Sequence, residues 1–277
     1  MIQLVFTDVD GTLVGSSGTV LPEVWPAAES LRAAGVRMAI CSGRPAFGDA
    51  RAYAERLDPD GWHVFQNGAS VLHLATGKSL STPVPEQSVV ALIGRARETG
   101  RILELYTDSE YAVESTEPRA REHAALLGVP FTPRPFSSLG GPIVRAQWLV
   151  DRADEEETVA DDTGDLERTS STSPVMPETS FINMTARGVD KGRAVRVVAE
   201  AYDIPLADVM FVGDGNNDVP ALRVVGFPVA MANAEPEVRA AARVVVGHVD
   251  DAGLTAAFAL ALDSRPARVA PSRLTIR

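Results

Sequence analysis

The chain has 277 residues, 45% of them hydrophobic, and a formal net charge of −11 at pH 7. This size and apolar content allow one large and one small domain with a buried core, while the negative charge argues against nucleic acid or an anionic membrane as the main partner. No apolar run reaches the roughly 18 residues of a membrane span. An apolar strand begins at residue 2, so we expect no signal peptide and a cytoplasmic protein with no obligate protein partner.

The first predicted strand runs from Ile2 to Phe6 and is followed by Thr7, Asp8, Val9, Asp10, Gly11 and Thr12. Ligands bind beyond the carboxyl ends of the strands in an open α/β sheet. The alternation Asp8, Val9, Asp10 places both carboxylates on one side of an extended segment, and Gly11 allows a turn in which Thr12 bonds back to its own loop. An Asp-Gly pair alone is also typical of an ordinary turn, so further evidence must come from elsewhere in the chain.

A helix is expected over residues 22–34, followed by a strand over residues 36–41 that ends in Ser42, Gly43, Arg44 and Pro45. A hydroxyl and free backbone N–H groups at the start of a following helix can hold phosphate oxygens. The sequence next predicts a helix near 46–57, a strand near 63–65, a turn at Asn67-Gly68 and a strand at 70–74. Arg44 and Asn67 are candidate substrate contacts, although a surface ion pair and a structural turn explain them equally well.

Pro83 and Pro85 mark a boundary, after which the pattern changes to that of an α+β unit. In this unit we expect helices at 86–98, 118–127 and 153–161, and strands near 101–106, 111–115, 143–150 and 174–184. The Thr/Ser segment 169–173 is predicted to be a hairpin loop. The acidic run from Asp151 to Asp165 is interpreted as a solvated helix face.

The earlier pattern then resumes with a helix over 190–202, a strand over 208–212, a helix over 217–225 and short strands near 228–231 and 243–246. Lys191 opens the first of these helices. It is one of only two lysines, with Lys78, against twenty-four arginines. A compact ammonium at this place can pair with a phosphate or with a nucleophilic carboxylate, although one of two lysines can also stand there by chance.

A second acidic loop, from Gly213 to Asp218, follows the strand over 208–212. Carboxylates from this loop and from the first one can share a divalent cation, and Mg²⁺ usually takes one or two carboxylates together with water and phosphate oxygens. The loop lacks the spacing and the terminal glutamate of an EF-hand. The lone Cys41 is expected in the core, the four histidines show no metal-ligand spacing, and the tail 263–277 is expected to be a frayed end.

The four stretches around Asp8, Ser42, Lys191 and Asp214, in this order, resemble the four motifs of the haloacid dehalogenase (HAD) superfamily of phosphatases. More narrowly, the chain is similar to the Cof-like subfamily, whose type IIB cap is inserted between the second and third motifs. Residues 213–221 and 228–234 look especially similar to that subfamily. The resemblance covers residues 2–262. It agrees with a doubly wound, Rossmann-like parallel sheet as the core (1–82 and 187–262), with an inserted α+β cap (83–186).

The resemblance implies a phosphoric monoester hydrolase. Asp8 matches the nucleophile that forms an aspartyl phosphate, and Asp10 matches the general acid and base. Lys191 matches the cation that steadies the nucleophile and the phosphate. Mg²⁺ would be bound by Asp8, by the backbone carbonyl of Asp10 and by Asp214.

The remaining matches concern the phosphate. Ser42 and the Gly43 amide match the phosphate clamp, Asn217 matches a phosphate contact, and Asp218 is placed as a partner of Lys191 or of the metal. The expected substrate is a small phosphorylated metabolite, with sugar phosphates the leading class by resemblance. Cap arginines such as Arg134 and Arg145 could meet a second anionic group on it.

Two other functions stay open at this point. A phosphomutase or phosphotransferase would need a bisphosphate activator and would move phosphate instead of releasing it. A non-catalytic regulator would bind a phosphorylated ligand without turning it over. The presence of Asp8, Asp10, Lys191 and Asp214 counts against the regulator, since a pure binder has no need of the second aspartate.

Overall fold

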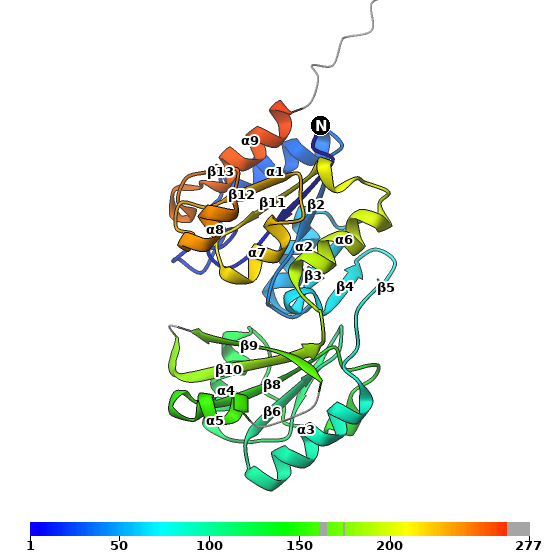
Figure 1. Ribbon diagram of the computed structural model, residues 1–277, viewed down its shortest axis with the longest axis vertical. Helices are drawn as coiled ribbons and strands as arrows, with labels where there is room; N and C mark the ends of the chain where they lie inside the picture. Colours follow the sequence, from blue (N-terminus) through cyan, green and yellow to red (C-terminus); the bar gives the residue numbers. More distant parts are fainter. Residues whose placement is uncertain (161–164, 174, 265–277) are drawn as a thin grey trace, which may run out of the picture.

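The computed structural model describes residues 1–160, 165–173 and 175–264. Figure 1 shows two layered parts, one above the other, joined along one side by two chain segments. We call the part built on the parallel sheet the core, and the part built on the five-stranded antiparallel sheet the cap. In the described part of the chain, no helix has the length and apolar character needed to cross a membrane.

The core sheet has five parallel strands in the order β13-β12-β11-β1-β2. Its strands are β1 (Leu4–Thr7), β2 (Arg37–Ile40), β11 (Val209–Gly213), β12 (Phe227–Ala230) and β13 (Val244–Val245). In the central strand, Leu4 pairs with Arg37 of β2 on one side and with Val209 of β11 on the other. Because these strands are parallel, the loops that follow β1, β2 and β11 meet at the same edge of the sheet.

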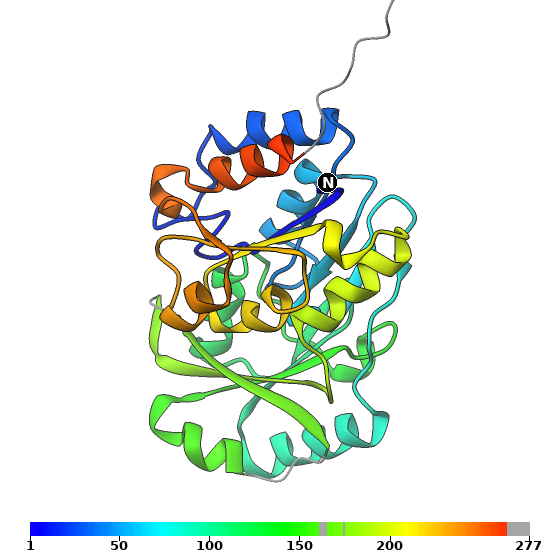
Figure 2. The ribbon, with the colours of Figure 1, turned by 45° about the horizontal axis from the view of Figure 1, so that its top comes forward.

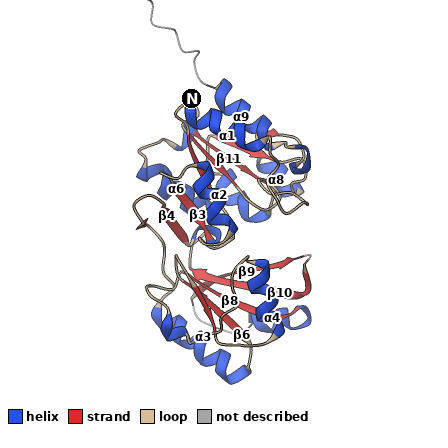
Figure 3. Ribbon diagram, turned by 180° about the vertical axis from the view of Figure 1, so that it is seen from behind, coloured by secondary structure: helices blue, strands red, loops and turns tan. Residues whose placement is uncertain are grey.

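Helices cover both faces of the core sheet, as Figure 3 shows from behind. Val5 of β1 packs in one buried cluster with α1 (Val24–Ala33), α2 (Asp49–Leu57) and α9 (Leu254–Asp263). Leu4 and Phe6 pack in a second cluster with α6 (Lys191–Ala201), α7 (Val219–Leu222) and α8 (Pro236–Ala241). Alternate side chains of one strand thus serve opposite layers, and the prediction of a doubly wound core is confirmed.

A small antiparallel sheet extends the core beyond β2. It consists of β3 (Trp62–Phe65), β4 (Ser70–His73) and β5 (Lys78–Ser79). A parallel bridge between Cys41 and Val64 connects it to the end of β2, and Cys41 is buried as expected. The tight connection between β3 and β4 holds Asn67 in the left-handed region, at φ 56°, which asparagine tolerates better than most residues.

The cap sheet has the strand order β7-β6-β8-β10-β9. Its strands are β6 (Ile102–Tyr106), β7 (Tyr111–Val113), β8 (Arg145–Asp151), β9 (Leu166–Ser173) and β10 (Met176–Ala186). Its helices are α3 (Glu86–Thr99), α4 (Pro118–Leu126) and α5 (Glu155–Ala160). One face packs in a cluster with Leu92 of α3, and the other packs with Ala120 of α4. In Figure 2, turned from the first view, the cap again lies below the core and next to it.

Single-turn 3-10 helices complete the described structure, at Gln66–Gly68, Phe136–Ser138, Arg152–Asp154, Leu206–Asp208, Asn216–Asp218 and Val249–Asp251. The predicted helix over 217–225 is therefore shorter than expected, because it begins as a 3-10 turn and its α-helical part ends at Leu222.

The prediction of a hairpin loop at 169–173 is wrong, because these residues lie in strand β9. Ser171 pairs with Phe181 of β10, and an outer strand of a sheet tolerates a run of polar side chains because one of its edges is unpaired. Strand β5 and helices α8 and α9 were not predicted. Asp263 is the last residue of α9 rather than the start of a tail, and residues 265–277 and 161–164 lie outside the described residues.

Candidate active site

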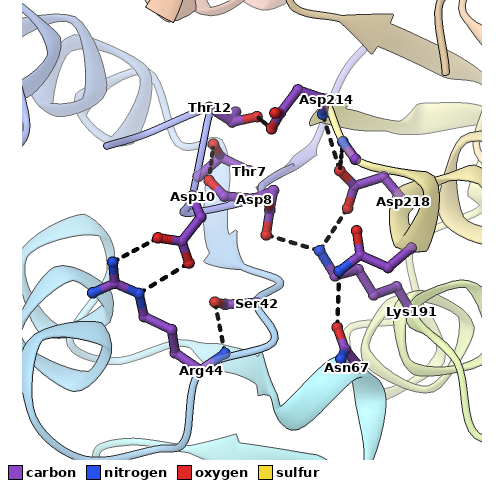
Figure 4. A network of polar contacts seen from close by, with 12 residues as sticks. Thr7, Asp8, Asp10, Thr12, Ser42, Arg44, Asn67, Lys191, Asp214 and Asp218 are labelled. Atoms are coloured by element: carbon purple, nitrogen blue, oxygen red, sulfur yellow. Dashed lines mark hydrogen bonds and ion pairs between the residues drawn. The ribbon is translucent and has the colours of Figure 1, made fainter. Parts of the chain in front are cut away.

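A cavity of about 550 Å³ lies between the carboxyl edge of the core sheet and the cap. Six of the predicted site residues line it from the core: Asp8, Asp10, Gly43, Arg44, Asn67 and Asn217. Lys191, Asp214, Asp218 and Ser42 are not among the lining residues and lie behind or beside them. Figure 4 shows how most of these side chains converge from the loops after β1, β2 and β11 and from the start of α6.

Lys191 lies between two carboxylates under the cavity. Its Nζ donates to Asp8 Oδ1 at 2.8 Å and to Asp218 Oδ1 at 2.6 Å, and the lysine side chain is fully buried. Burial by itself would lower the pKa of Lys191, but the charges of Asp218 and Asp8 outweigh it and raise the pKa above its ordinary value. The site therefore holds a permanently charged ammonium against one oxygen of Asp8.

Asp8 is 5% exposed and follows β1 directly. Its pKa lies well above the ordinary value, first because of burial and then because Asp218, Asp214 and Asp10 repel its charge, whereas Lys191 acts in the opposite direction. Lys191 contacts only one of the two carboxylate oxygens. Asp8 lines the cavity, and its second carboxylate oxygen accepts no hydrogen bond from Lys191.

Asp218 organises the second acidic loop. Its Oδ2 accepts the backbone N–H groups of Asp214 and Gly215, at 3.0 and 3.1 Å, while its Oδ1 accepts from Lys191. Gly213 is required beside it, because a Cβ there would lie 2.3 Å from Asp218 Oδ2. Asp218 thus positions both the loop and the ammonium and is fully buried.

Asp214 is held by partners from distant parts of the chain. Thr12 Oγ1 donates to its Oδ1 at 2.8 Å, and Asn233 Nδ2 lies 3.4 Å from its Oδ2. The expectation that Thr12 bonds back to its own loop is therefore wrong for the side chain. Gly11, at φ 83°, leaves the space that Asp214 occupies, since a Cβ would lie 2.0 Å from its Oδ2. Burial raises the pKa of Asp214 to about 6, and the Thr12 hydrogen bond opposes that shift.

The acidic side chains fit a divalent cation. One carboxylate oxygen from each of Asp8, Asp214 and Asp218 lies within 4.8 Å of the others. Both oxygens of Asp218 already accept hydrogen bonds, so Asp8 and Asp214 have the greater remaining capacity for a metal. A cation between them would relieve the repulsion that raises both pKa values.

Asp10 has a different partner from Asp8. Arg44 Nε donates to Asp10 Oδ2 at 2.9 Å and Nη2 donates to Oδ1 at 2.6 Å, so the guanidinium grips both carboxylate oxygens (Figure 4). The side chain of Asp10 is 61% exposed. Asp8 and Asp10 therefore line the same cavity in different surroundings. The carboxylate of Asp8 is buried and paired with a lysine, whereas that of Asp10 is exposed and paired with an arginine.

The loop after β2 presents its backbone to the cavity. Gly43 and Arg44 line the cavity, whereas Ser42 is fully buried and its Oγ accepts the N–H of Arg44 at 3.0 Å. On the other side, Asn217 Nδ2 donates to Asn67 Oδ1 at 3.0 Å. Both asparagines line the cavity, so the second acidic loop and the turn after β3 meet there.

The cap contributes residues that the sequence did not single out. They include His123 and Leu127 from α4 and its end, Gln147 from β8, Ser171 from β9, and Phe181 and Asn183 from β10. Arg145, named as a candidate, lines the cavity too, but Arg134 is not among its lining residues and pairs with Glu110 at 2.6 Å. Alternating polar residues at 145 and 147 were the available signal, since alternate strand positions share a face.

Comparison with known proteins agrees with this geometry. The family model described as haloacid dehalogenase-like hydrolase matches residues 5–258. A phosphoglycolate phosphatase of Methanopyrus kandleri is 29% identical over 89% of this chain and 91% of its own length. A solved protein of Geobacillus kaustophilus superposes with a TM-score of 0.80 at 26% identity, covering 94% of this chain and 98% of that one. The HAD subclass IIB sugar phosphatase BT4131 superposes with a TM-score of 0.76 at 23% identity, covering 93% of this chain and 98% of that one.

Proposed function

The chain belongs to the haloacid dehalogenase-like hydrolases and is a phosphatase of the Cof-like type, and from this premise we propose that it is a magnesium-dependent phosphatase of small phosphorylated metabolites. The observation that carries the proposal is the pairing of buried Asp8 with Lys191 at the cavity, beside Asp214. A nucleophile, a fixed cation and a second acid for metal binding are thus assembled from three distant segments.

In this proposal the oxygen of Asp8 that Lys191 leaves free attacks phosphorus. A bond forms between that oxygen and phosphorus, the bond from phosphorus to the substrate's ester oxygen breaks, and Asp10 gives its proton to the leaving oxygen. Asp10 then takes a proton from a water molecule, whose oxygen forms a bond to phosphorus. The bond between phosphorus and the Asp8 oxygen breaks, which frees Asp8 and releases inorganic phosphate. Lys191 keeps Asp8 oriented throughout and offsets negative charge on the transferred group.

Asp8, Asp214 and the backbone carbonyl of Asp10 are the groups that would hold Mg²⁺. Bound there, the cation supplies positive charge next to the phosphate oxygens. Thr12 and Asn233 keep the Asp214 carboxylate in place for this purpose. Asp218 fixes the loop through the Asp214 and Gly215 amides and holds Lys191, so we assign it a positioning role.

The phosphate would be bound by the groups that surround the free oxygen of Asp8. We assign this role to the Gly43 amide, Asn217 and the loop that Ser42 supports, with Arg44 close by. Arg44 also holds Asp10 by both oxygens, so a phosphate that attracts the guanidinium would loosen that grip. The same arginine is then a substrate contact and a support for the general acid.

The substrate class follows from the size and covering of the cavity. The cap sheet and α4 line the cavity opposite the catalytic loops, which suits a small metabolite better than a phosphoprotein. We propose residues 83–186 as the cap and residues 1–82 with 187–262 as the core. Sugar phosphates are the expected class, and the named activity of the Methanopyrus relative adds a short phosphorylated acid, phosphoglycolate, to the set to be tried.

Phosphate release from a panel of esters tests the proposal. The panel contains sugar phosphates, phosphoglycolate, nucleotides and 4-nitrophenyl phosphate, each assayed with Mg²⁺ and with a chelator, for the wild type and Asp8→Asn. We expect release that requires Mg²⁺ and is lost in Asp8→Asn. Phosphate that moves between positions of a sugar only when a bisphosphate is added would contradict the proposal in favour of a mutase.

A further inference from the structure

Two arginines line the cavity within the described part of the chain, Arg44 and Arg145, and they differ in the charged groups that contact them. Arg44 forms its two-pronged pair with Asp10 and lies 4.0 Å from Asp49. Arg145, at the start of β8 in the cap, pairs with no carboxylate within residues 1–160, 165–173 and 175–264. It is 4% exposed. A buried guanidinium without an acidic partner is unusual, because buried charges are normally paired.

Every described contact of Arg145 is with a neutral group. Its Nη1 donates to the carbonyl of Gly43 at 3.1 Å and lies 3.3 Å from Asn183 Oδ1. The guanidinium lies over the Tyr106 ring, 4.0 Å from its centroid. Its Nε is buried and has no hydrogen-bond partner. The guanidinium is thus held by two neutral oxygens and an aromatic ring, and its Nε–H group remains available as a hydrogen-bond donor.

The carboxylate of Glu104 acts on the charge of Arg145 but is not bonded to it, because its oxygens already accept other hydrogen bonds. Glu104, fully buried in β6, accepts from Tyr106 Oη at 2.6 Å, from His123 Nδ1 at 3.0 Å and from Gln147 Nε2 at 3.3 Å. These bonds fix His123 and Gln147, which both line the cavity. The network therefore fixes His123 and Gln147 in the cavity wall. Glu104 acts on the charge of Arg145 without contacting it, so the guanidinium that lines the cavity can still take an anionic partner there.

We propose that Arg145 is a specificity-determining residue that binds a carboxylate on the leaving group of the substrate. This inference rests on the proposed phosphatase function and, among small phosphorylated metabolites, favours phosphate esters of short hydroxy acids over the sugar phosphates that the resemblance implies. A guanidinium matches a carboxylate in geometry, since two parallel N–H groups can meet two oxygens. The single negative charge of a carboxylate also balances the single positive charge of Arg145, whereas a second phosphate group carries roughly two negative charges.

The position of Arg145 indicates that the two anions of the substrate lie close together. Its Nη1 contacts the carbonyl of Gly43, and the N–H of that same residue belongs to the proposed phosphate clamp. A ligand that reaches from the clamp to Arg145 therefore needs only a short chain between its two anionic groups. His123, Gln147 and Asn183 are placed to contact hydroxyl groups on such a chain.

A different role for Arg145 is purely structural: its hydrogen bond to Gly43 would hold the cap against the core, and we call this role a latch. The two roles differ in what they predict for paired substrates. Loss of a latch lowers kcat/KM equally for an acid and for its neutral counterpart. Loss of a carboxylate site lowers kcat/KM for the acid alone and leaves the ratio of the two values near unity.

The test compares 3-phosphoglycerate with glycerol 3-phosphate, which differ only by a carboxylate in place of a hydroxymethyl group. We expect the wild type to prefer the acid by at least tenfold in kcat/KM, and Arg145→Gln to lose that preference. Arg134→Gln is the matched control, a cap arginine outside the cavity lining, and should keep the preference. Fructose 1,6-bisphosphate tests whether a second phosphate substitutes for the carboxylate, and a preference for it over the acid would overturn the proposal.

The wild-type ratio is informative even if Arg145→Gln does not fold. Turnover of 4-nitrophenyl phosphate without any preference for the acid overturns the carboxylate site and leaves the phosphatase function standing. Absence of turnover of every ester contradicts the phosphatase function instead. Calorimetric binding of 3-phosphoglycerate against glycerol 3-phosphate then decides on the carboxylate site separately, with equal affinity counting against it.

Discussion

The ammonium of Lys191 lies 2.8 Å from Oδ1 of Asp8, although 183 positions separate the two residues in the sequence. The contact exists because β1 and the helix that starts at Lys191 lie in adjacent layers of the core. Asp218 shares the same ammonium. One buried cation thus holds two buried carboxylates, and their geometry depends on it.

Removal of that cation should damage both stability and activity. Lys191→Met leaves Asp8 and Asp218 as uncompensated buried acids, and the loss of one partner of a buried pair typically costs about 3–5 kcal/mol. We expect a fall of about that size in the free energy of unfolding, measured by urea titration, and a loss of phosphatase activity of at least about a hundredfold. Lys78→Met is the control at the other lysine, which is exposed on β5, and should change neither quantity measurably.

Asp214→Asn should stabilise the metal-free protein while removing metal binding. A pKa raised to about 6 means that the folded state binds the proton more tightly than the unfolded state, so stability falls as the pH rises from about 4 to about 6. The negative charge of Asp214 then lowers the free energy of unfolding by at most about 3 kcal/mol at neutral pH. With chelator at pH 7.5 we expect a higher Tm for Asp214→Asn and no increase in Tm on adding Mg²⁺. Asp60→Asn, at an exposed position, should leave both results as in the wild type.

Metal affinity should weaken in acid because protons compete for the same oxygens. Burial raises the pKa of Asp214 to about 6, and burial is also the main reason why the pKa of Asp8 lies well above its ordinary value. Below about pH 6 Asp214 is increasingly protonated in the metal-free protein, so the Mg²⁺ concentration for half-maximal activity should rise between pH 7.5 and pH 5.5. A half-maximal concentration that does not change over this interval would exclude these carboxylates as the metal ligands.

Arg44→Gln should lower activity with little effect on stability. The guanidinium holds both oxygens of Asp10, but the Asp10 side chain is 61% exposed, so the pair adds little to folding. We expect kcat/KM to fall by about tenfold or more, with Tm nearly unchanged in differential scanning calorimetry. Arg44→Lys should restore only part of the activity, because an ammonium cannot reproduce the two-pronged grip. Arg51→Gln, which breaks an exposed pair with Glu55, is the control.

Much of the core was predictable because its strands are short apolar runs that end in glycine and acidic residues. The two loops that carry Asp8 and Asp214 follow buried strands of the same parallel sheet, and such strand ends meet at one edge. The polar contacts across that edge were not predictable. Thr12 reaches Asp214 over 202 positions, and a hydroxyl in a turn has many local acceptors that serve equally well in the sequence.

The structure of the cap was harder to predict from the sequence than that of the core, because the face that lines the cavity depends on pairings between distant strands. Residues 169–173 have polar side chains typical of a loop, yet they form an outer strand whose backbone pairs with β10. His123 enters the cavity wall because α4 packs on the cap sheet and Glu104 holds its ring. The helix itself was predicted, at 118–127, but neither its packing against the sheet nor the glutamate partner leaves a local pattern in the sequence.

Covalent phosphate on Asp8 is the most direct test of the account. The wild type, Asp8→Asn and Asp10→Asn would be mixed with ³²P-labelled 4-nitrophenyl phosphate and Mg²⁺, quenched in acid within milliseconds to seconds, and the protein-bound label counted. This ester has a leaving group that needs little protonation, so Asp10→Asn should still form the aspartyl phosphate and fail to hydrolyse it.

We predict little label on the wild type, a nearly stoichiometric amount on Asp10→Asn that is released by hydroxylamine, and none on Asp8→Asn. Label that persists on Asp8→Asn would contradict Asp8 as the nucleophile. Release of phosphate by the wild type with no label on Asp10→Asn at any time would contradict the covalent route itself.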